Sequence, residues 1–332
     1  MTTNTPCHKT LSIPSLNTIF VITPKLNQVA ELMEDCRLDS KITNDPQCMI
    51  ITGDTGSGKT SLIEYYQKEK PNLEDTYASK IPILSTSLPE SSTPITAAQQ
   101  LLYDLGDPFY SKSDNIIELT AKLVTLIKNC QVEMIIIDEF QHMIDFKTKQ
   151  VLCRVADWLK MLIVRTKVPF ILFGLPYSEL ILQSNKQLAG RFLLRQSLDP
   201  FRIKSKNNRI AFLSFLNAVD RALPFEKNSN LTDLKIAKAL YFSSKGNLRN
   251  LIVLINHSIK RTKKKGEPSL SIDSLKYAAD ILSITSPNPF TLENIELSDI
   301  VEPPQHVGWE SILEQKKVKN KDIKLTIDDL FG

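Results

Sequence analysis

The sequence is short of glycine, with 10 in 332 residues, and its five cysteines are scattered without Cys-x-x-Cys spacing. An odd, dispersed set of cysteines excludes a disulfide framework and argues against a zinc site, so a reducing cytoplasm is the expected setting. No apolar stretch reaches the length of about 18 residues that a membrane-spanning helix needs. The N-terminus also lacks the basic segment and apolar run of a signal peptide.

The sequence has little excess of charge of either sign, with 41 Lys and Arg against 37 Asp and Glu and a net charge of +4. Such a balance does not by itself predict nucleic-acid binding, and any DNA contact must come from local patches. Hydrophobic residues make up 42% of the chain, which is ordinary for a globular protein, and the length suggests about two domains.

The first two thirds of the chain alternate predicted strands and helices. Strands are expected at residues 48–51, 81–86, 132–137 and 168–173, and helices at 24–37, 95–105, 115–128 and 149–166. This alternation predicts βαβ units and the α/β fold class, with a mostly parallel sheet flanked by helices. The near-continuous apolar run at 132–137 is typical of an inner strand that is buried on both faces.

The strand pattern fades after about residue 204, and the following segments have helical periodicity. Helices are expected at residues 207–220, 231–242, 247–261 and 273–283. The predicted organisation is a leader at 1–22, an α/β core at 23–204, a small helical domain at 205–283 and an extended tail at 284–332.

One segment fits the phosphate-loop pattern G-x-x-x-x-G-K-[ST] in full. It reads Gly53-Asp54-Thr55-Gly56-Ser57-Gly58-Lys59-Thr60, followed by Ser61. Glycines let the backbone curl so that successive N–H groups meet phosphate oxygens, and the following helix start favours anions. Lys59 is expected to reach the β- and γ-phosphates of ATP, and the Thr60 hydroxyl to hold Mg²⁺.

The second motif is the apolar strand that ends in Asp138 and Glu139. A carboxylate at the end of a buried strand lies beside the phosphate loop in this architecture. Asp138 is therefore expected to orient Mg²⁺, and Glu139 to polarise the attacking water. The two motifs together predict a P-loop ATPase.

Three arginines are candidates for contact with the triphosphate. Arg191 and Arg195 lie in the segment 188–195, and either could stabilise transferring charge in a neighbouring subunit or form a surface salt bridge. Arg249 follows Gly246 at the start of a predicted helix, where it could fold over the γ-phosphate or cap local carboxylates.

The order of these pieces resembles the AAA+ superfamily, and within it the TnsC/TniB family of ATPase regulators of DNA transposition. The resembling stretches are 48–65, 131–142, 168–192 and 244–254, and the likeness covers roughly residues 18–285. The resemblance implies an AAA+ core with a helical lid, in which Arg191 is the trans-acting arginine with Arg195 as fallback. It also implies that Arg249 is the lid arginine called sensor 2.

The chain departs from the AAA+ pattern at one point. Many of these ATPases end the fourth strand with a polar side chain, called sensor 1, whereas this chain has Phe173 and Gly174. The departure suits a slow regulatory switch better than a fast motor.

The resemblance further implies homo-oligomeric rings or filaments that assemble on double-stranded DNA with ATP. Lys112 and Ser113 after the second strand, and Lys147 and Lys149 after Glu139, are the candidate DNA contacts, although a solvated lysine is the common alternative.

The expected function is a transposition regulator that recruits a transposase and a target-selection protein of the TniQ type, with ATP hydrolysis driving disassembly. The alternative is a replication-initiator or helicase-loader ATPase. A winged-helix domain would favour that alternative, and only a short polar tail follows the predicted lid.

Overall fold

The computed structural model describes residues 22–43, 45–70, 73–74, 79–145, 148–282, 287–292, 295 and 302. The chain forms two compact units that divide between Asp199 and Pro200. The sequence had placed this boundary at 204. The division comes earlier because Phe201 and Ile203 pack into the core of the second unit.

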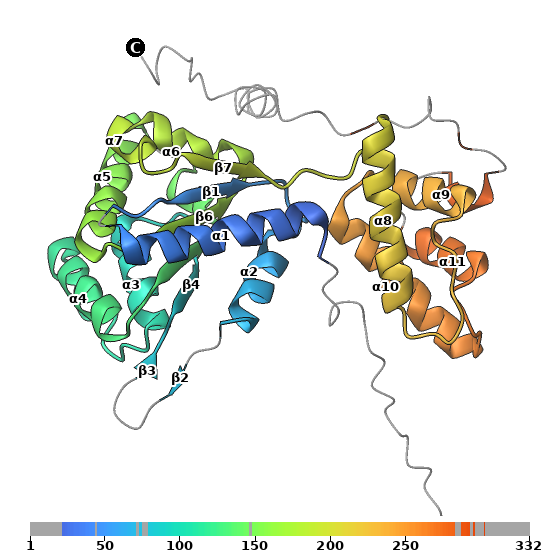
Figure 1. Ribbon diagram of the computed structural model, residues 1–332, viewed down its shortest axis with the longest axis horizontal. Helices are drawn as coiled ribbons and strands as arrows, with labels where there is room; N and C mark the ends of the chain where they lie inside the picture. Colours follow the sequence, from blue (N-terminus) through green and yellow to red (C-terminus); the bar gives the residue numbers. More distant parts are fainter. Residues whose placement is uncertain are drawn as a thin grey trace, which may run out of the picture. The chain divides into compact units, whose positions relative to one another are not determined.

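The first unit is an α/β domain (Figure 1). Its elements are α1 (Pro24–Ile42), β1 (Met49–Thr52), α2 (Lys59–Lys68), β2 (Leu73–Glu74), β3 (Ser79–Lys80), β4 (Ile83–Ser87), α3 (Pro94–Asp104), α4 (Ile116–Asn129), β5 (Met134–Asp138), η2 (Phe140–Met143), α5 (Lys149–Thr166), β6 (Phe170–Gly174), η3 (Pro176–Glu179), α6 (Leu180–Gln183), α7 (Lys186–Ala189) and β7 (Leu194–Ser197). Every helix and strand expected in this region is present, with ends within two residues of those predicted except for α1, which continues to Ile42 instead of ending at 37.

The main sheet has the strand order β4-β5-β6-β1-β7, and all four pairings are parallel. The central strands β1, β5 and β6 are buried along their whole length, as the apolar runs predict. Alternate strand residues, including Ile50, Ile135 and Leu172, share one core cluster with the apolar faces of α3, α4 and α5. A separate two-stranded sheet pairs β2 with β3 antiparallel.

The edge strand β7 was not predicted from the sequence. Its residues Leu194, Arg195, Gln196 and Ser197 alternate between half-buried and exposed and contain no apolar run. The strand exists because its backbone pairs in register with β1, from Met49 opposite Leu194 to Thr52 opposite Ser197. An edge strand with one partner needs little apolar surface, so its composition carries little signal.

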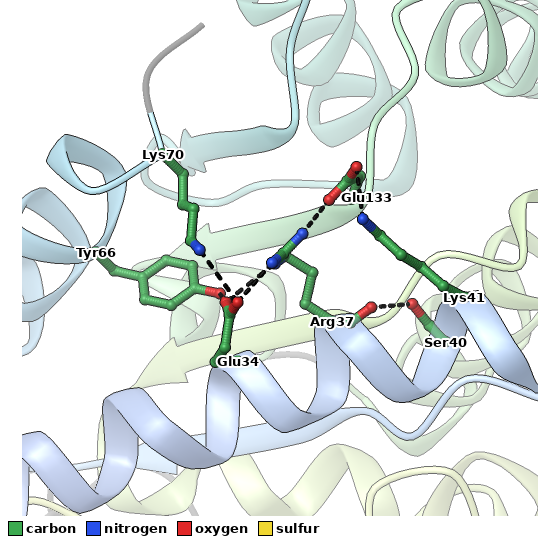
Figure 2. A network of polar contacts seen from close by, with 7 residues as sticks. All are labelled: Glu34, Arg37, Ser40, Lys41, Tyr66, Lys70 and Glu133. Atoms are coloured by element: carbon green, nitrogen blue, oxygen red, sulfur yellow. Dashed lines mark hydrogen bonds and ion pairs between the residues drawn. The ribbon is translucent and has the colours of Figure 1, made fainter.

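A polar network fastens α1 to the rest of this unit (Figure 2). Arg37 forms ion pairs with Glu34 on its own helix and with Glu133, the residue before β5. Glu34 also accepts hydrogen bonds from Tyr66 of α2, at 2.6 Å, and from Lys70, at 3.1 Å. Together these contacts tie α1, α2 and the start of β5.

The second unit is helical and contains α8 (Lys206–Ala222), α9 (Leu234–Ser244), α10 (Leu248–Lys265), α11 (Ile272–Leu282) and η4 (Pro289–Thr291). The sequence predicted an extended tail from residue 284. The described residues Phe290 and Ile295 are instead buried in the helical core, and the Glu302 carboxylate accepts the backbone N–H groups of Ile203 and Lys204, each at 2.7 Å. Among the described helices, none has the length and apolarity to span a membrane.

Candidate phosphate-binding site

The candidate residues of the two ATP motifs lie at one edge of the main sheet. The loop 53–60 follows β1, Asp138 ends β5, and Gly174 ends β6. Because these neighbouring strands are parallel, their carboxyl ends meet at the same edge, which is where open α/β sheets bind ligands.

The loop has the backbone geometry that its glycines allow. Gly58 precedes the first residue of α2 with φ 95° and ψ 10°, a left-handed conformation that few other residues adopt without strain. Gly53 lies between two strand ends: its N–H donates to the Gly174 carbonyl at 3.1 Å, and a Cβ there would lie 2.6 Å from the Leu198 carbonyl oxygen. The strand, loop and helix expected at 48–65 are therefore all present.

The structure joins the two motifs directly. The Thr60 hydroxyl donates to Oδ2 of Asp138 at 3.0 Å, across 78 residues of sequence. Lys59 is buried, and its ammonium donates to the carbonyl oxygens of Gly53, at 2.7 Å, and Asp54, at 3.0 Å. A lysine held over the loop in this way is in place to exchange carbonyl oxygens for phosphate oxygens.

Asp138 is a carboxylate in a buried setting, with 5% of its surface exposed. Burial raises the pKa of its carboxyl group above the ordinary value, and the neighbouring Glu139 acts in the same direction. Hydrogen bonds from the Glu139 N–H and the Thr60 hydroxyl, and the charge of Lys59, oppose this rise. A buried carboxylate of this kind is stabilised by a bound cation.

The residues present fit a triphosphate with its metal. Ser57 Oγ is buried and has no hydrogen-bond partner within the described part of the chain, so the loop has an unused polar atom. The first N–H groups of α2 have no acceptor within their own helix. The described residues contain no group of three or more His, Cys, Asp or Glu side chains that could hold a metal. Thr60 and Asp138 match instead the pattern of Mg²⁺, which takes few protein ligands and shares phosphate oxygens.

Two further residues of the predicted set lie beside this centre. Thr55 and Ser61 are exposed, the first in the loop and the second in the first turn of α2.

Glu139, the candidate base, directly follows β5 and has a left-handed backbone, with φ 55° and ψ 35°. Such a conformation in a residue other than glycine is uncommon and concentrates at active sites. Its N–H donates to Oδ1 of Asp138 at 2.8 Å, and its carboxylate accepts a hydrogen bond from the side-chain amide of Gln141. Gln141 was not predicted as a site residue, and its only signal in the sequence is its place two residues after Glu139.

The structure places Arg191 away from its own phosphate loop. Its carbonyl accepts the N–H of Cys48 at 2.9 Å, just before β1, whereas the loop follows β1. The rise of about 3.3 Å per strand residue puts roughly 16 Å between these two ends. Its guanidinium pairs with the exposed Asp45.

The other two candidate arginines lie on β7 and in the helical unit. Arg195 lies on β7, is 47% exposed and has Glu179 3.9 Å away. Arg249 belongs to the helical unit, where it is exposed in the first turn of α10, and Asn247 caps this helix by accepting the Asn250 N–H at 3.2 Å.

Two of the four candidate DNA contacts have described side chains. Lys112 is exposed between α3 and α4, with its ammonium 3.8 Å from the centre of the Phe109 ring. Ser113 donates to Glu118 at 2.8 Å and accepts the Asn115 N–H, so its hydroxyl helps to begin α4. Lys149 is the first residue of α5, and Lys147 lies outside the described residues.

Solved structures show what the fold is similar to. The ADP form of Aeropyrum pernix ORC2 matches with a TM-score of 0.55 and 16% identity, over 85% of this chain and 75% of that chain. Cdc6p of Pyrobaculum aerophilum matches at 0.57 and 12%, over 94% and 79%. Aeropyrum pernix ORC1, solved in complex with DNA, matches at 0.51 and 13%, over 79% and 66%. Identities this low establish the fold alone.

The comparison with protein families is more specific. No curated protein matches the chain. A family model described as "Bacterial TniB protein" matches residues 17–201, which is more than half of the chain and includes both ATP motifs. The α/β unit therefore has the AAA+ ATPase fold, and the chain belongs to the TniB family.

Proposed function

We propose that this protein is an ATP-dependent regulator of DNA transposition that assembles on target DNA and hydrolyses ATP to disassemble. The observation that carries the ATPase part is the 3.0 Å hydrogen bond between Thr60 and Asp138, which brings the phosphate loop and the acidic strand end into one site. Membership of the TniB family supports the role in transposition.

The chain's own groups suggest how hydrolysis proceeds. The loop N–H groups and Lys59 would bind the β- and γ-phosphates, and Thr60 with Asp138 would hold Mg²⁺. The metal would neutralise charge on the phosphate oxygens. Glu139 polarises a water for attack on the γ-phosphorus, and the products are ADP and phosphate. No group other than water receives the phosphoryl group.

The position of Arg191 supports a site shared between subunits. Since it lies at the opposite end of β1 from its own loop, it is suited to a neighbour's triphosphate rather than to its own. ATP then bridges two copies of the chain and favours a ring or filament. Arg195 is the alternative donor, and Arg249 is proposed as a further arginine for the triphosphate.

DNA binding is proposed through exposed cations that neutralise phosphates without reading bases. Lys112 is the best described candidate, and Ser113, Lys147 and Lys149 complete the proposed set. The fold-level match to an ORC1 protein solved in complex with DNA agrees with this role. In an assembly of many subunits, the small positive charges of the individual subunits would act together on the DNA.

The partners follow from the proposed role. The assembled surface would recruit a transposase and a target-selection protein of the TniQ type. The alternative role, in replication initiation, has support only from the fold-level likeness to ORC2 and Cdc6p. The family match favours the transposition role.

Two variants test the proposal by separating nucleotide binding from turnover. Lys59→Ala should weaken ATP binding about 10- to 100-fold, because a charge-assisted contact is lost, and should abolish ATP-dependent assembly on duplex DNA. Glu139→Gln should bind ATP normally but lower turnover about 100-fold or more, and its DNA complexes should persist. Equilibrium binding, phosphate release and electron micrographs with duplex DNA measure these effects.

The control is Lys68→Ala, which removes an exposed lysine from the last turn of the same helix. It should behave as the parent protein. Unchanged ATP affinity in Lys59→Ala would contradict the phosphate-loop assignment. If the parent protein assembled on DNA equally well with and without ATP, the proposed nucleotide-dependent switch would be contradicted.

A further inference from the structure

Gln141 connects the candidate base to the neighbouring strand. Its side chain is 4% exposed, within η2 between the buried residues Phe140 and Met143. The amide nitrogen donates to Oε2 of Glu139, and the amide oxygen accepts the backbone N–H of Leu175 at 3.2 Å. The amide nitrogen is therefore hydrogen-bonded to the acidic motif, and the amide oxygen to the residue that follows β6.

Gly174 makes this arrangement possible. A Cβ at this position would lie 2.3 Å from Ser178 Oγ and 3.2 Å from Oε1 of Gln141. The absence of a side chain at the end of β6 therefore leaves room for the amide. The Gly174 carbonyl also accepts the N–H of Gly53, so the same strand end contacts the phosphate loop.

We propose that Gln141 is a positioning residue for hydrolysis, a role that rests on the ATPase function proposed above. It compensates for the missing polar side chain at 173–174, because it reaches the end of β6 from the loop after β5. Its hydrogen bond engages Oε2 of Glu139 and directs Oε1 toward the attacking water. The left-handed backbone of Glu139 lets its side chain meet Gln141, two residues further on.

The amide offers a chemical reason for glutamine at this position. An amide has a donor for the Glu139 carboxylate and an acceptor for the Leu175 N–H, and it carries no charge. A glutamate at the same place would keep the acceptor but lose the donor, and its carboxylate would repel that of Glu139.

The first test compares Gln141→Met with the parent protein in single-turnover hydrolysis of bound ATP. Methionine keeps the volume and length but removes both hydrogen bonds. The rate should fall about 10-fold or more, while ATP affinity stays within about twofold, because the two hydrogen bonds of the Gln141 amide go to Glu139 and Leu175, outside the phosphate loop. Gln99→Met is the matched control, since Gln99 also uses its amide in two hydrogen bonds, at 3.2 Å each, with Ser113 and Asp114.

The second test is Gln141→Glu, which keeps an acceptor for the Leu175 N–H but loses the donor to Glu139. Its single-turnover rate should also fall about 10-fold or more while ATP affinity stays within about twofold. A residue that acts only on folding would not separate the rate of hydrolysis from ATP affinity in this way.

A third measurement uses the nucleotide-free protein and needs no turnover. A double-mutant cycle compares the stability of Gln141→Met, Glu139→Gln and the double variant by thermal unfolding. If the two side chains interact, the stability lost in the double variant should be smaller than the sum of the losses in the two single variants. Additive losses of stability, or parent-like single-turnover rates in both Gln141→Met and Gln141→Glu, would overturn the assignment. If the parent protein itself did not hydrolyse ATP, the proposed ATPase function would be wrong, and the role of Gln141 in hydrolysis would be wrong with it.

Discussion

Two glycines flank α10, and they differ in how much space a side chain would have. Gly246 and Gly266 both have positive φ, +74° and +67°. A Cβ on Gly246 would lie 2.0 Å from the carbonyl oxygen of Phe201, whereas one on Gly266 would have no atom of the described residues within 4 Å. The Phe201 N–H also donates to the Gly246 carbonyl at 2.9 Å. Gly246 thus combines a left-handed backbone with a close approach to a second segment.

This difference predicts unequal losses of stability. Gly266→Ala should lower the free energy of unfolding by about 1 kcal/mol, the cost of the left-handed conformation for alanine. Gly246→Ala should lower it by about 2 kcal/mol more, because the backbone of Phe201 must also move. Urea unfolding of the two variants measures both values. If the two variants lost the same free energy of unfolding, the backbone around Phe201 would be able to move away from the added methyl group without a loss of stability.

The helix α1 shows how an element is held by charge as well as by apolar contacts. Val29 and Met33 are fully buried, while Arg37 and Glu34 connect the helix to α2 and to the start of β5 (Figure 2). The hydrogen bond from Arg37 is the largest influence on Glu34, and with help from Tyr66 and Lys70 it overcomes burial and lowers the pKa of Glu34 to about 2.

Because the pKa of Glu34 is lowered in the folded protein, the stability that Glu34 contributes depends on pH. The contribution of Glu34 is complete above its ordinary pKa of 4.5 and is lost as the pH falls through about 2. Glu34→Gln should therefore be less stable than the parent protein at pH 7, by roughly 1–2 kcal/mol, and this difference should narrow as the pH falls from 4.5 toward 2.

Chemical unfolding at several pH values checks this prediction. Glu31→Gln, an exposed position on the same helix, is the control. A difference between Glu34→Gln and the parent that stays constant down to the lowest pH would show that the charge of Glu34 does not stabilise the network.

At the scale of the whole molecule, the proposed site needs residues from two copies. Lys59 and Asp138 lie at one end of the sheet, while Arg191 lies beyond the other end of β1. One chain therefore carries two separate halves of the proposed interface, the phosphate loop and the arginine. Copies that repeat this contact head to tail would form a ring or a filament.

Mixing two inactive variants tests whether the site is shared. Arg191→Ala alone should lose about 1000-fold in turnover, as expected when an arginine finger is removed. Adding Lys59→Ala, which keeps Arg191 but binds ATP only weakly through its own phosphate loop, should restore part of the phosphate release. Arg195→Ala mixed in the same way is the matched comparison. Intact assembly of Arg191→Ala without any rescue would assign the trans role to Arg195.

Much of the fold could be read from the sequence because its signals are local. The buried strands β1, β5 and β6 are apolar runs, and α5 was predicted at the residues it occupies, 149–166, from its apolar periodicity. The short pieces 176–197 were missed, since η3, α6 and α7 each have only four residues and β7 has no apolar run. The described part of the predicted tail was missed for another reason, because Phe290 and Ile295 are isolated apolar residues whose burial depends on distant helices.

The sequence by itself determined the residues of the phosphate loop and the acidic strand end, because both motifs are contiguous and their spacing has one chemical meaning. Only the tertiary structure decided what those motifs touch. The contact between Thr60 and Asp138, the bridge from Glu139 through Gln141 to Leu175, and the separation of Arg191 from its own loop all depend on strand order in the sheet. Strand order brings distant segments together through backbone pairing, and no local pattern of residues encodes that arrangement.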